Sequence, residues 1–339
     1  MADPLILAEA RTRLTRGATV GVAVELVGHS PAITRVQELV RRAAALDGGV
    51  LLTAEPGAAV ESVAHELHVR SRRSAGPYVI VECSDVDATR ADRLLFGAPV
   101  PDAPTDLESL GSDGRVAAAR GGTLFLQDVA ELPAAVQARL ARIARDGEMR
   151  VDGAQVASGF RLVASAMPAI DADVNAHRFR IDLYRRLSST RIDLPPLRER
   201  AEDVPALAAR LLDDICDERG VPRRSFTQAA LALVGALTWP GNVSELHDAI
   251  ERVVTDAHDA VVQIEHLLSA LQLRRAPAAF TPAGNLREAR LRFERDYIAA
   301  VLQHHGWRMV EAARTLGIQR PNLYRKARQL GIPLTRISD

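Results

Sequence analysis

The chain has 339 residues, of which 47% are hydrophobic and 25% are charged, and its 43 basic and 43 acidic side chains give a formal net charge of zero. This length suggests two or three domains, and the composition is typical of a globular protein rather than a disordered one. No apolar run reaches the ~18–20 residues of a membrane-spanning helix, and residues 1–17 are too interrupted by charge for a signal peptide. Cys83 and Cys216 have no metal-binding spacing, so we expect a cytoplasmic protein without a membrane partner.

The basic residues are unusual in type and in position. Lys326 is the only lysine, which excludes any mechanism that needs a lysine elsewhere in the chain. Residues 284–339 carry ten arginines and Lys326 against five acidic residues, so this segment has a net charge of +6 and the rest of the chain −6. A basic C-terminal block on an acidic body indicates a module that binds a polyanion. The alternative is a basic helix face that is merely solvated.

The first two-thirds of the chain alternates between predicted strands and predicted helices. Residues 1–22 have little pattern and are expected to form a tail or a short helix. Four short apolar segments are predicted strands, at residues 49–53, 78–81, 123–126 and 160–164. Helical patterns lie between them, including one that ends at Arg70 and one from Ala134 to Arg145. Strands separated by helices in this way indicate a parallel sheet covered on both faces.

After Leu194-Pro195-Pro196 the pattern changes to helices alone. They are predicted at residues 203–218, 227–236, 243–256 and 264–271, which we interpret as a separate helical subdomain. Residues 274–284 contain two prolines and four alanines without periodicity, as expected of a linker. A long amphipathic helix is predicted from Leu286 to His304, followed by two shorter helices.

The two shorter helices have the pattern of a helix-turn-helix. In the first, Ala312 and Ala313 lie on one apolar face, and Gly317 permits a left-handed residue in the turn that follows. Pro321 falls in the first turn of the second helix, where proline is well tolerated. Two short helices joined by a tight glycine turn are typical of this motif.

The second of these helices is expected to read DNA. Leu323, Ala327 and Leu330 would face inward. The residues that we expect to contact DNA are Gln319, Arg320, Asn322, Tyr324, Arg325, Lys326 and Arg328. Such an element can enter a major groove, where Arg and Asn bind base edges and other cations hold phosphates. A helical hairpin used only for packing is the alternative.

With the long helix before it, this segment resembles the Fis-type DNA-binding domain. The resemblance covers about 55 residues, from 285 to 339. In that family the long helix supplies a dimer interface, so the resemblance implies a dimer and a pseudo-palindromic operator in double-stranded DNA.

Five motifs in the middle of the chain occur in a specific order. They are LFG at 95–97, GGTLFL at 121–126, FRIDLYRRL at 179–187, LPPLRER at 194–200 and WPGNV at 239–243. On these motifs residues 24–273 resemble the AAA+ domain of the bacterial enhancer-binding proteins, which are sigma-54-dependent activators. The resemblance implies an α/β fold, with an AAA+ parallel-sheet subdomain at 23–195 and a helical lid at 196–273. The linker at 274–284 then leads to the all-α Fis-type helix-turn-helix domain at 285–339.

The segment that corresponds to the family's phosphate-binding loop, residues 54–61, departs from the expected pattern. Such a loop needs glycines whose N–H groups surround the phosphates and a lysine for the β- and γ-phosphates. Val60 occupies the lysine position, two glycines have become alanine, and Pro56 lacks an N–H donor. The vestigial nucleotide-binding positions are Glu55, Gly57 and Glu61. We therefore expect no bound ATP or magnesium.

The family's metal-binding and catalytic positions also differ. The strand that should end in Asp-Glu ends in Gln127-Asp128, where Gln127 lacks the charge that holds magnesium and Asp128 is about one methylene short of a catalytic glutamate. Met167 falls at the usually polar sensor position, and Ser244 replaces the arginine of the lid. These departures predict an inactive ATPase with no catalytic residue and no metal.

Two further features concern assembly and the contact with sigma-54. Arg180 and Arg186 match arginines that act across the subunit interface in the family; the alternative is that they form ion pairs at an interface or within one chain. Between Gly97 and Gly121 the GAFTGA motif that engages sigma-54 is missing. Four acidic residues lie there instead, and one interpretation is that they simply form a solvated surface. They are Asp102, Asp106, Glu108 and Asp113. We expect no remodelling of sigma-54.

Three hypotheses about function remain open. The first is a DNA-binding transcriptional regulator, not dependent on sigma-54, whose degenerate AAA+ domain serves oligomerisation or ligand sensing. It would form a homo-oligomer, a dimer through the C-terminal module and a larger assembly through the AAA+ domain, with RNA polymerase as a possible partner. The second is an ATP-dependent sigma-54 activator with a divergent pocket. The third is a non-catalytic subunit that inserts its arginines into an active relative within a mixed ring.

Overall fold

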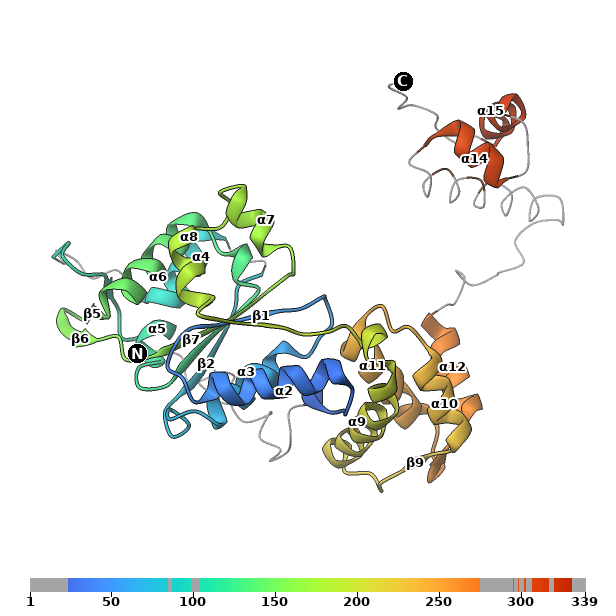
Figure 1. Ribbon diagram of the computed structural model, residues 1–339, viewed down its shortest axis with the longest axis horizontal. Helices are drawn as coiled ribbons and strands as arrows, with labels where there is room; N and C mark the ends of the chain where they lie inside the picture. The colour runs from blue at the N-terminus through green and yellow to red at the C-terminus, as the bar shows by residue number, and fades with distance from the viewer. Residues whose placement is uncertain are drawn as a thin grey trace. The chain divides into compact units, whose positions relative to one another are not determined.

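The computed structural model describes residues 24–84, 87–98, 104–274, 307–316 and 320–330, together with positions 295, 298 and 302. The chain divides into two compact units, Met1–Leu273 and Arg274–Asp339 (Figure 1). The predicted tail at 1–22, nearly all of the linker and most of the predicted helix at 286–304 lie outside the described residues. Among the described residues, no helix has the length and apolar character needed to cross a bilayer.

The first unit is built on a parallel five-stranded sheet. Its strands are β1 (Val50–Thr53), β2 (Tyr78–Glu82), β4 (Thr123–Gln127), β7 (Arg161–Ala166) and β8 (Thr190–Asp193), in the order β2-β4-β7-β1-β8. The four strands predicted from the sequence are confirmed within two residues at each end. The edge strand β8 was not predicted, because Ile192 is its only apolar residue and it lacks the apolar run of a strand buried on both faces.

Helices cover both faces of this sheet, as the β-α pattern predicts. They are α2 (Pro31–Ala44), α3 (Val60–Val69), α4 (Ala88–Phe96), α5 (Arg115–Ala118), α6 (Ala134–Asp146), α7 (Ile170–Asn175) and α8 (Ile181–Leu187). Because side chains alternate along a strand, Leu52 and Phe125 pack against α2 and α3, whereas Leu51 and Leu124 pack against α4, α6 and α8. Figure 1 shows these two groups of helices on opposite sides of the sheet.

A smaller sheet lies beside the main one and was not predicted. It contains β3 (Ser109–Leu110), β5 (Glu148–Val151) and β6 (Ala154–Ala157), and β5 pairs with β6 in antiparallel fashion. The turn between them is Asp152-Gly153, and both residues have positive φ angles, 47° and 85°. Asp-Gly favours the two-residue hairpin turn that needs this backbone geometry, so this dipeptide was a usable sequence signal.

The lid has its own hydrophobic core. It comprises the short 3-10 turns η3 (Leu197–Glu199) and η4 (Ala201–Asp203), followed by the helices α9 (Val204–Arg219), α10 (Gln228–Ala236), α11 (Asn242–Asp256) and α12 (Ile264–Arg274). The four predicted helices are confirmed. The prediction of helices alone is wrong, because β9 (Ser225–Phe226) pairs in parallel with β10 (Val261–Val262). Two-residue strands are too short to produce an alternating pattern in the sequence.

The second unit contains the helices α14 (Met309–Thr315) and α15 (Arg320–Gln329). Both match the two short helices predicted from the sequence. Ala312, Ala313, Leu323 and Ala327 are buried in a small core with Met309, as the apolar pattern predicts. Leu316 and Leu330 pack against that core from its edge. The predicted turn residues Gly317 and Ile318 lie outside the described residues.

A polar cluster is buried under α3 at the amino-terminal edge of the main sheet. His68 lies with its Nδ1 2.9 Å from the Thr123 hydroxyl, and its ring centroid is 5.2 Å from that of Tyr78. Burial lowers the pKa of His68 below its usual 6.5, and the positive charges of His65 and Arg161 lower it further. The folded chain therefore favours the neutral form of His68.

This cluster makes the folding stability depend on pH. The unfolded chain binds a proton at His68 at a higher pH than the folded chain does, so the free energy of unfolding should fall as the pH drops below about 6.5. Urea denaturation between about pH 7.5 and pH 5.5 checks this. The slope of the free energy of unfolding against pH should become shallower in His68→Gln. It should stay unchanged in the control His258→Gln, which alters an exposed histidine. Equal slopes in all three proteins would contradict the prediction.

Candidate nucleotide site and DNA-binding helix

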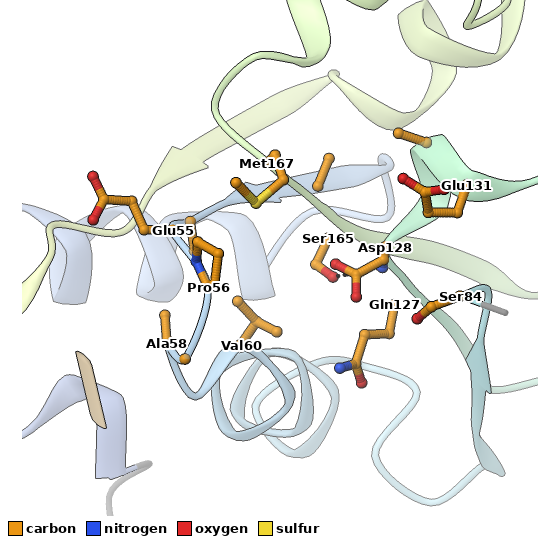
Figure 2. A pocket seen from close by; sticks show the side chains of 14 residues that line it. Glu55, Pro56, Ala58, Val60, Ser84, Gln127, Asp128, Glu131, Ser165 and Met167 are labelled. Carbon is orange, nitrogen blue, oxygen red and sulfur yellow. Dashed lines mark hydrogen bonds between the residues drawn. The ribbon is translucent and has the colours of Figure 1, made fainter. Parts of the chain in front are cut away.

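A cavity of about 460 Å³ opens at the carboxyl ends of the parallel strands (Figure 2). This is where open α/β sheets bind ligands. The lining residues are Ala54, Glu55, Pro56, Gly57, Ala58, Val60, Ser84, Gln127, Asp128, Ala130, Glu131, Ser165, Ala166 and Met167. None of them is basic. The cavity thus presents carboxylates, neutral polar groups and apolar groups, but no cation of its own.

One wall of the cavity is the loop between β1 and α3. Val60 is the first residue of α3, and its half-buried side chain packs against the core under α2 and α3 while it also lines the cavity. Figure 2 shows Val60 beside Pro56 and Ala58 on this side. An isopropyl group therefore lies where the resemblance places an ammonium group. Glu55 and Gly57 line the cavity as expected, whereas Glu61 does not.

The opposite wall is the end of β4. Asp128 has a left-handed backbone with φ 54°, and its N–H donates to the Ser165 hydroxyl at 3.0 Å. Burial raises the pKa of Asp128, and the negative charges of Glu131 and Glu82 raise it further. This wall disfavours an anion, because Asp128 and Glu131 both line the cavity and no described arginine does.

The remaining predicted positions are also accounted for. Met167 follows β7, lines the cavity and is 46% exposed. Ser244 lies in the first turn of α11 and does not line the cavity, but its N–H donates to the Gly57 carbonyl at 2.9 Å. The fold thus brings Val60, Gln127 and Asp128 into one cavity and places the lid directly behind the loop.

Arg180 and Arg186 both lie on the surface, outside the cavity lining. The Arg180 guanidinium donates two hydrogen bonds, of 3.0 and 2.7 Å, to Asp182. Arg180 therefore forms an ion pair within its own chain, which was one of the two alternatives. Arg186 is exposed in the last turn of α8 and makes no ion pair with any described residue. Of the two, Arg186 is the one available to a neighbouring molecule.

The described part of the segment that lacks the GAFTGA motif, from residue 104 onward, forms ion pairs with the body of the domain. Glu108 accepts from Arg139 at 2.9 Å and lies 3.2 Å from Arg142, and the Arg139 guanidinium lies 4.0 Å from the centre of the Phe96 ring. Asp106 pairs with Arg150, whose hydrogen bonds lower the pKa of Asp106.

At the other end of this segment, Asp113 pairs with Arg93 at 2.8 Å. The acidic residues described here are therefore paired with arginines, while the side chains of Asp106 and Asp113 stay 57% and 53% exposed, so the interpretation as a solvated surface stays a prediction. Asp102 lies outside the described residues.

A possible metal site that the sequence analysis did not predict lies on α11. His247, Asp248 and Glu251 offer ligand atoms within 4.8 Å of one another. Glu251, however, accepts a hydrogen bond of 2.7 Å from Arg219. We assign no function to this group.

The outer face of α15 is basic. Arg320, Arg325 and Arg328 are exposed, whereas Asn322, Tyr324 and Lys326 are half-buried. The Arg320 guanidinium lies 5.7 Å from the centre of the Tyr324 ring, and Arg325 donates to the Asn322 side-chain oxygen at 3.1 Å. Gln319 lies outside the described residues. The exposed arginines are suited to phosphates and base edges.

A lid folded over a loop at the carboxyl edge of a parallel sheet defines an AAA+-type α/β domain, here joined to a basic two-helix module. Comparison with known families agrees with this class. Residues 26–193 match the sigma-54 interaction domain, residues 198–282 the AAA+ ATPase lid domain, and residues 290–330 the bacterial regulatory proteins of the Fis family. The chain belongs to the sigma-54 activator family.

Individual relatives match over most of the chain. The alginate biosynthesis transcriptional regulatory protein AlgB of Pseudomonas aeruginosa is 35% identical over 91% of this chain and 68% of the relative. The nitrogen assimilation regulatory protein NtrX of Azorhizobium caulinodans is 32% identical over 91% and 69%. The crystal structure of NtrX from Brucella abortus in complex with ATP has a TM-score of 0.62 and 28% identity, covering 97% of this chain and 72% of that one.

The family assignment establishes a transcriptional regulator with a sigma-54 interaction domain, an AAA+ fold and a Fis-type domain for DNA binding. It favours the second hypothesis, an ATP-dependent sigma-54 activator, over the regulator without ATPase activity. The family resemblance and the fold class expected from the sequence are confirmed. The loss of ATPase activity is a separate question, which only the residues of the cavity address.

Proposed function

We propose that this protein is a sequence-specific DNA-binding transcriptional regulator whose AAA+ domain serves as a scaffold for oligomerisation or ligand sensing and does not hydrolyse ATP. The observation that carries the proposal is the cavity lined by Val60, Gln127 and Asp128 without any basic residue. A triphosphate buried there would leave its charge uncompensated, at a cost of several kcal/mol.

The mode of action in the proposal follows from the segment at 104–113. Its ion pairs with Arg139 and Arg150 keep it against the domain, where it is unsuited to reach out and engage a partner. The regulator would therefore act on RNA polymerase, or block it, without remodelling sigma-54. It would dimerise through the C-terminal module, and contacts through the exposed Arg186 would extend the assembly.

A second candidate function is the ATP-dependent sigma-54 activator, which the family assignment and the relative crystallised with ATP favour. In that case Asp128 would have to orient the attacking water, and the phosphates would have to bind without a nearby lysine. The third hypothesis, a non-catalytic subunit of a mixed ring, is favoured only by the free guanidinium of Arg186. Co-purification with an active relative, and a change in its ATPase rate that Arg186→Ala abolishes, would support that third function.

The proposal predicts that the purified protein neither binds nor hydrolyses Mg-ATP. Calorimetry should show no binding heat, and phosphate release should equal that of a sample without protein. Restoring charge with the triple variant Val60→Lys, Gln127→Asp, Asp128→Glu should produce a measurable heat of Mg-ATP binding, since each charged hydrogen bond contributes about 1.5–3 kcal/mol. Turnover by the wild type that Asp128→Ala abolishes would instead establish the ATP-dependent activator.

A further inference from the structure

The lid and the loop at residues 54–59 are joined by hydrogen bonds that involve the start of α11. The Asn242 side chain donates to the Pro56 carbonyl at 2.9 Å, and the Ser244 N–H donates to the Gly57 carbonyl at 2.9 Å. The first N–H groups of a helix have no partner within the helix and carry its positive dipole end. The Gly57 carbonyl therefore caps α11 from outside the lid, and the Pro56 carbonyl binds the side chain of its first residue.

The loop also fits the lid closely in shape. Gly57 has a φ of 82°, and a Cβ at this position would clash with the Gly241 carbonyl oxygen. Asn242 is 2% exposed, and its side-chain oxygen accepts the Leu197 N–H at 3.0 Å, so one side chain joins the loop, η3 and α11. Nothing larger than glycine could occupy this point of contact.

A charged pair at the rim adds to these contacts. Arg198 donates two hydrogen bonds of 2.6 Å to the two oxygens of Glu55. These bonds lower the pKa of Glu55, which keeps it ionised. Glu55 precedes the loop turn and Arg198 belongs to η3, so the pair connects the same two parts as Asn242.

The last contact involves a buried carboxylate. One oxygen of Glu25 accepts the Ala59 N–H at 2.7 Å, and the other accepts from the Arg200 guanidinium. Glu25 and Arg200 are each only 1% exposed. Burial raises the pKa of Glu25, while Arg200 and the Ala59 N–H oppose this shift by stabilising the carboxylate. An amide of the loop is thus already bound to an anion of the same chain.

We propose that these groups form an internal latch, defined as Glu25, Glu55, Pro56, Gly57 and Ala59 together with Arg198, Arg200, Asn242 and Ser244, which holds the lid closed on the loop without a nucleotide. Glu25 takes the place at the Ala59 amide that a phosphate oxygen occupies in a phosphate-binding loop. An incoming phosphate would have to displace a carboxylate that Arg200 holds in a dry environment. The inference deepens the proposed function, because a scaffold that needs no ATP must close by other means.

Distance measurements between spin labels on the two subdomains test the latch. Cys83 and Cys216 are buried, so labels would attach at Arg90→Cys on α4 and Glu265→Cys on α12, both exposed positions. Pulsed electron paramagnetic resonance on the full chain should give one narrow distance distribution, unchanged by Mg-ATP or by inorganic phosphate. A shift of the distribution on adding Mg-ATP would overturn the proposal.

Two variants open the latch and a third is the control. Arg198→Ala removes the rim pair, and Asn242→Gly removes the side-chain bonds while tolerating the positive φ of 49° at that position. Together they should broaden the distribution. Arg219→Ala breaks a similar ion pair within the lid, to Glu251, and should leave the distribution narrow. An unchanged distribution in the double variant, with a folded circular dichroism spectrum, would also overturn the proposal.

The latch and the proposed function can fail separately. If the distance distribution stays narrow and unchanged on adding Mg-ATP while the protein hydrolyses ATP, the latch is supported and the scaffold function is contradicted. A broad or nucleotide-dependent distribution in a protein without hydrolysis would defeat the latch alone.

Discussion

Replacing Glu25 with alanine is expected to lower the free energy of unfolding by about 3–5 kcal/mol, because it leaves the Arg200 guanidinium buried without a counterion. Both side chains are 1% exposed, and no other acidic side chain forms an ion pair with Arg200 among the described residues. The Ala59 N–H loses its acceptor in the same variant. Urea denaturation of the full chain, followed by the fluorescence of the buried Trp239 in a Trp307→Phe background, measures the change.

The matched control is Glu251→Ala, which removes the carboxylate of an exposed ion pair with Arg219. Exposed pairs contribute about 0–1 kcal/mol, so the control should be nearly neutral. The double variant Glu25→Ala, Arg200→Leu should recover part of the loss, because an apolar pair of side chains leaves no buried charge. A cost for Glu25→Ala no larger than that of the control would show that the pair does not hold the lid segment in place.

Replacing Arg325 with alanine is expected to weaken binding to specific DNA by about 5–150-fold, which corresponds to the 1–3 kcal/mol of a good base contact. Arg325 is exposed in the middle of α15, where Asn322 orients it through a hydrogen bond of 3.1 Å. Mobility shifts on a genomic site found by binding-site mapping measure the loss. On unrelated DNA, where phosphate contacts dominate, the loss of affinity caused by Arg325→Ala should be much smaller.

Arg90→Ala is the control for this experiment, because it removes the same charge from an exposed position on α4 in the other unit. It should leave specific binding within about twofold of the wild type. Equal effects of Arg325→Ala and Arg90→Ala would mean that α15 acts only through net charge. An absence of DNA binding at low salt would contradict the proposed function as a whole.

Among the strands, the sequence predicted most clearly those that are buried on both faces. β1, β4 and β7 are nearly continuous runs of buried side chains, so their pattern is strong. β8 and the strands of the small sheet were missed, since β3, β5 and β8 each contain one buried residue and β6 contains none. Arg161 is a charged residue whose burial the apolar pattern does not predict. It begins β7 and is 1% exposed, and the carbonyls of Ala43 and Gly48 accept its hydrogen bonds.

The candidate site was predictable from the sequence in its chemistry but only in part in its contacts. A resemblance in motifs brought together Val60, Gln127 and Asp128, and all three line one cavity. Glu25 was missed altogether, because an isolated glutamate in a short 3-10 turn has no motif. The binding of Asp106 and Glu108 by arginines was missed for a similar reason, since α6 and β5 follow them far along the chain.

The sequence by itself determined which charges are available, because a chain without a lysine before Lys326 has no ammonium group to place beside a phosphate. The tertiary structure decided what replaces that group. Glu25, Ala59 and Arg200 are far apart in the chain and become neighbours only when the lid packs on the sheet. Burial then makes their charges interact strongly, which no local pattern of residues encodes.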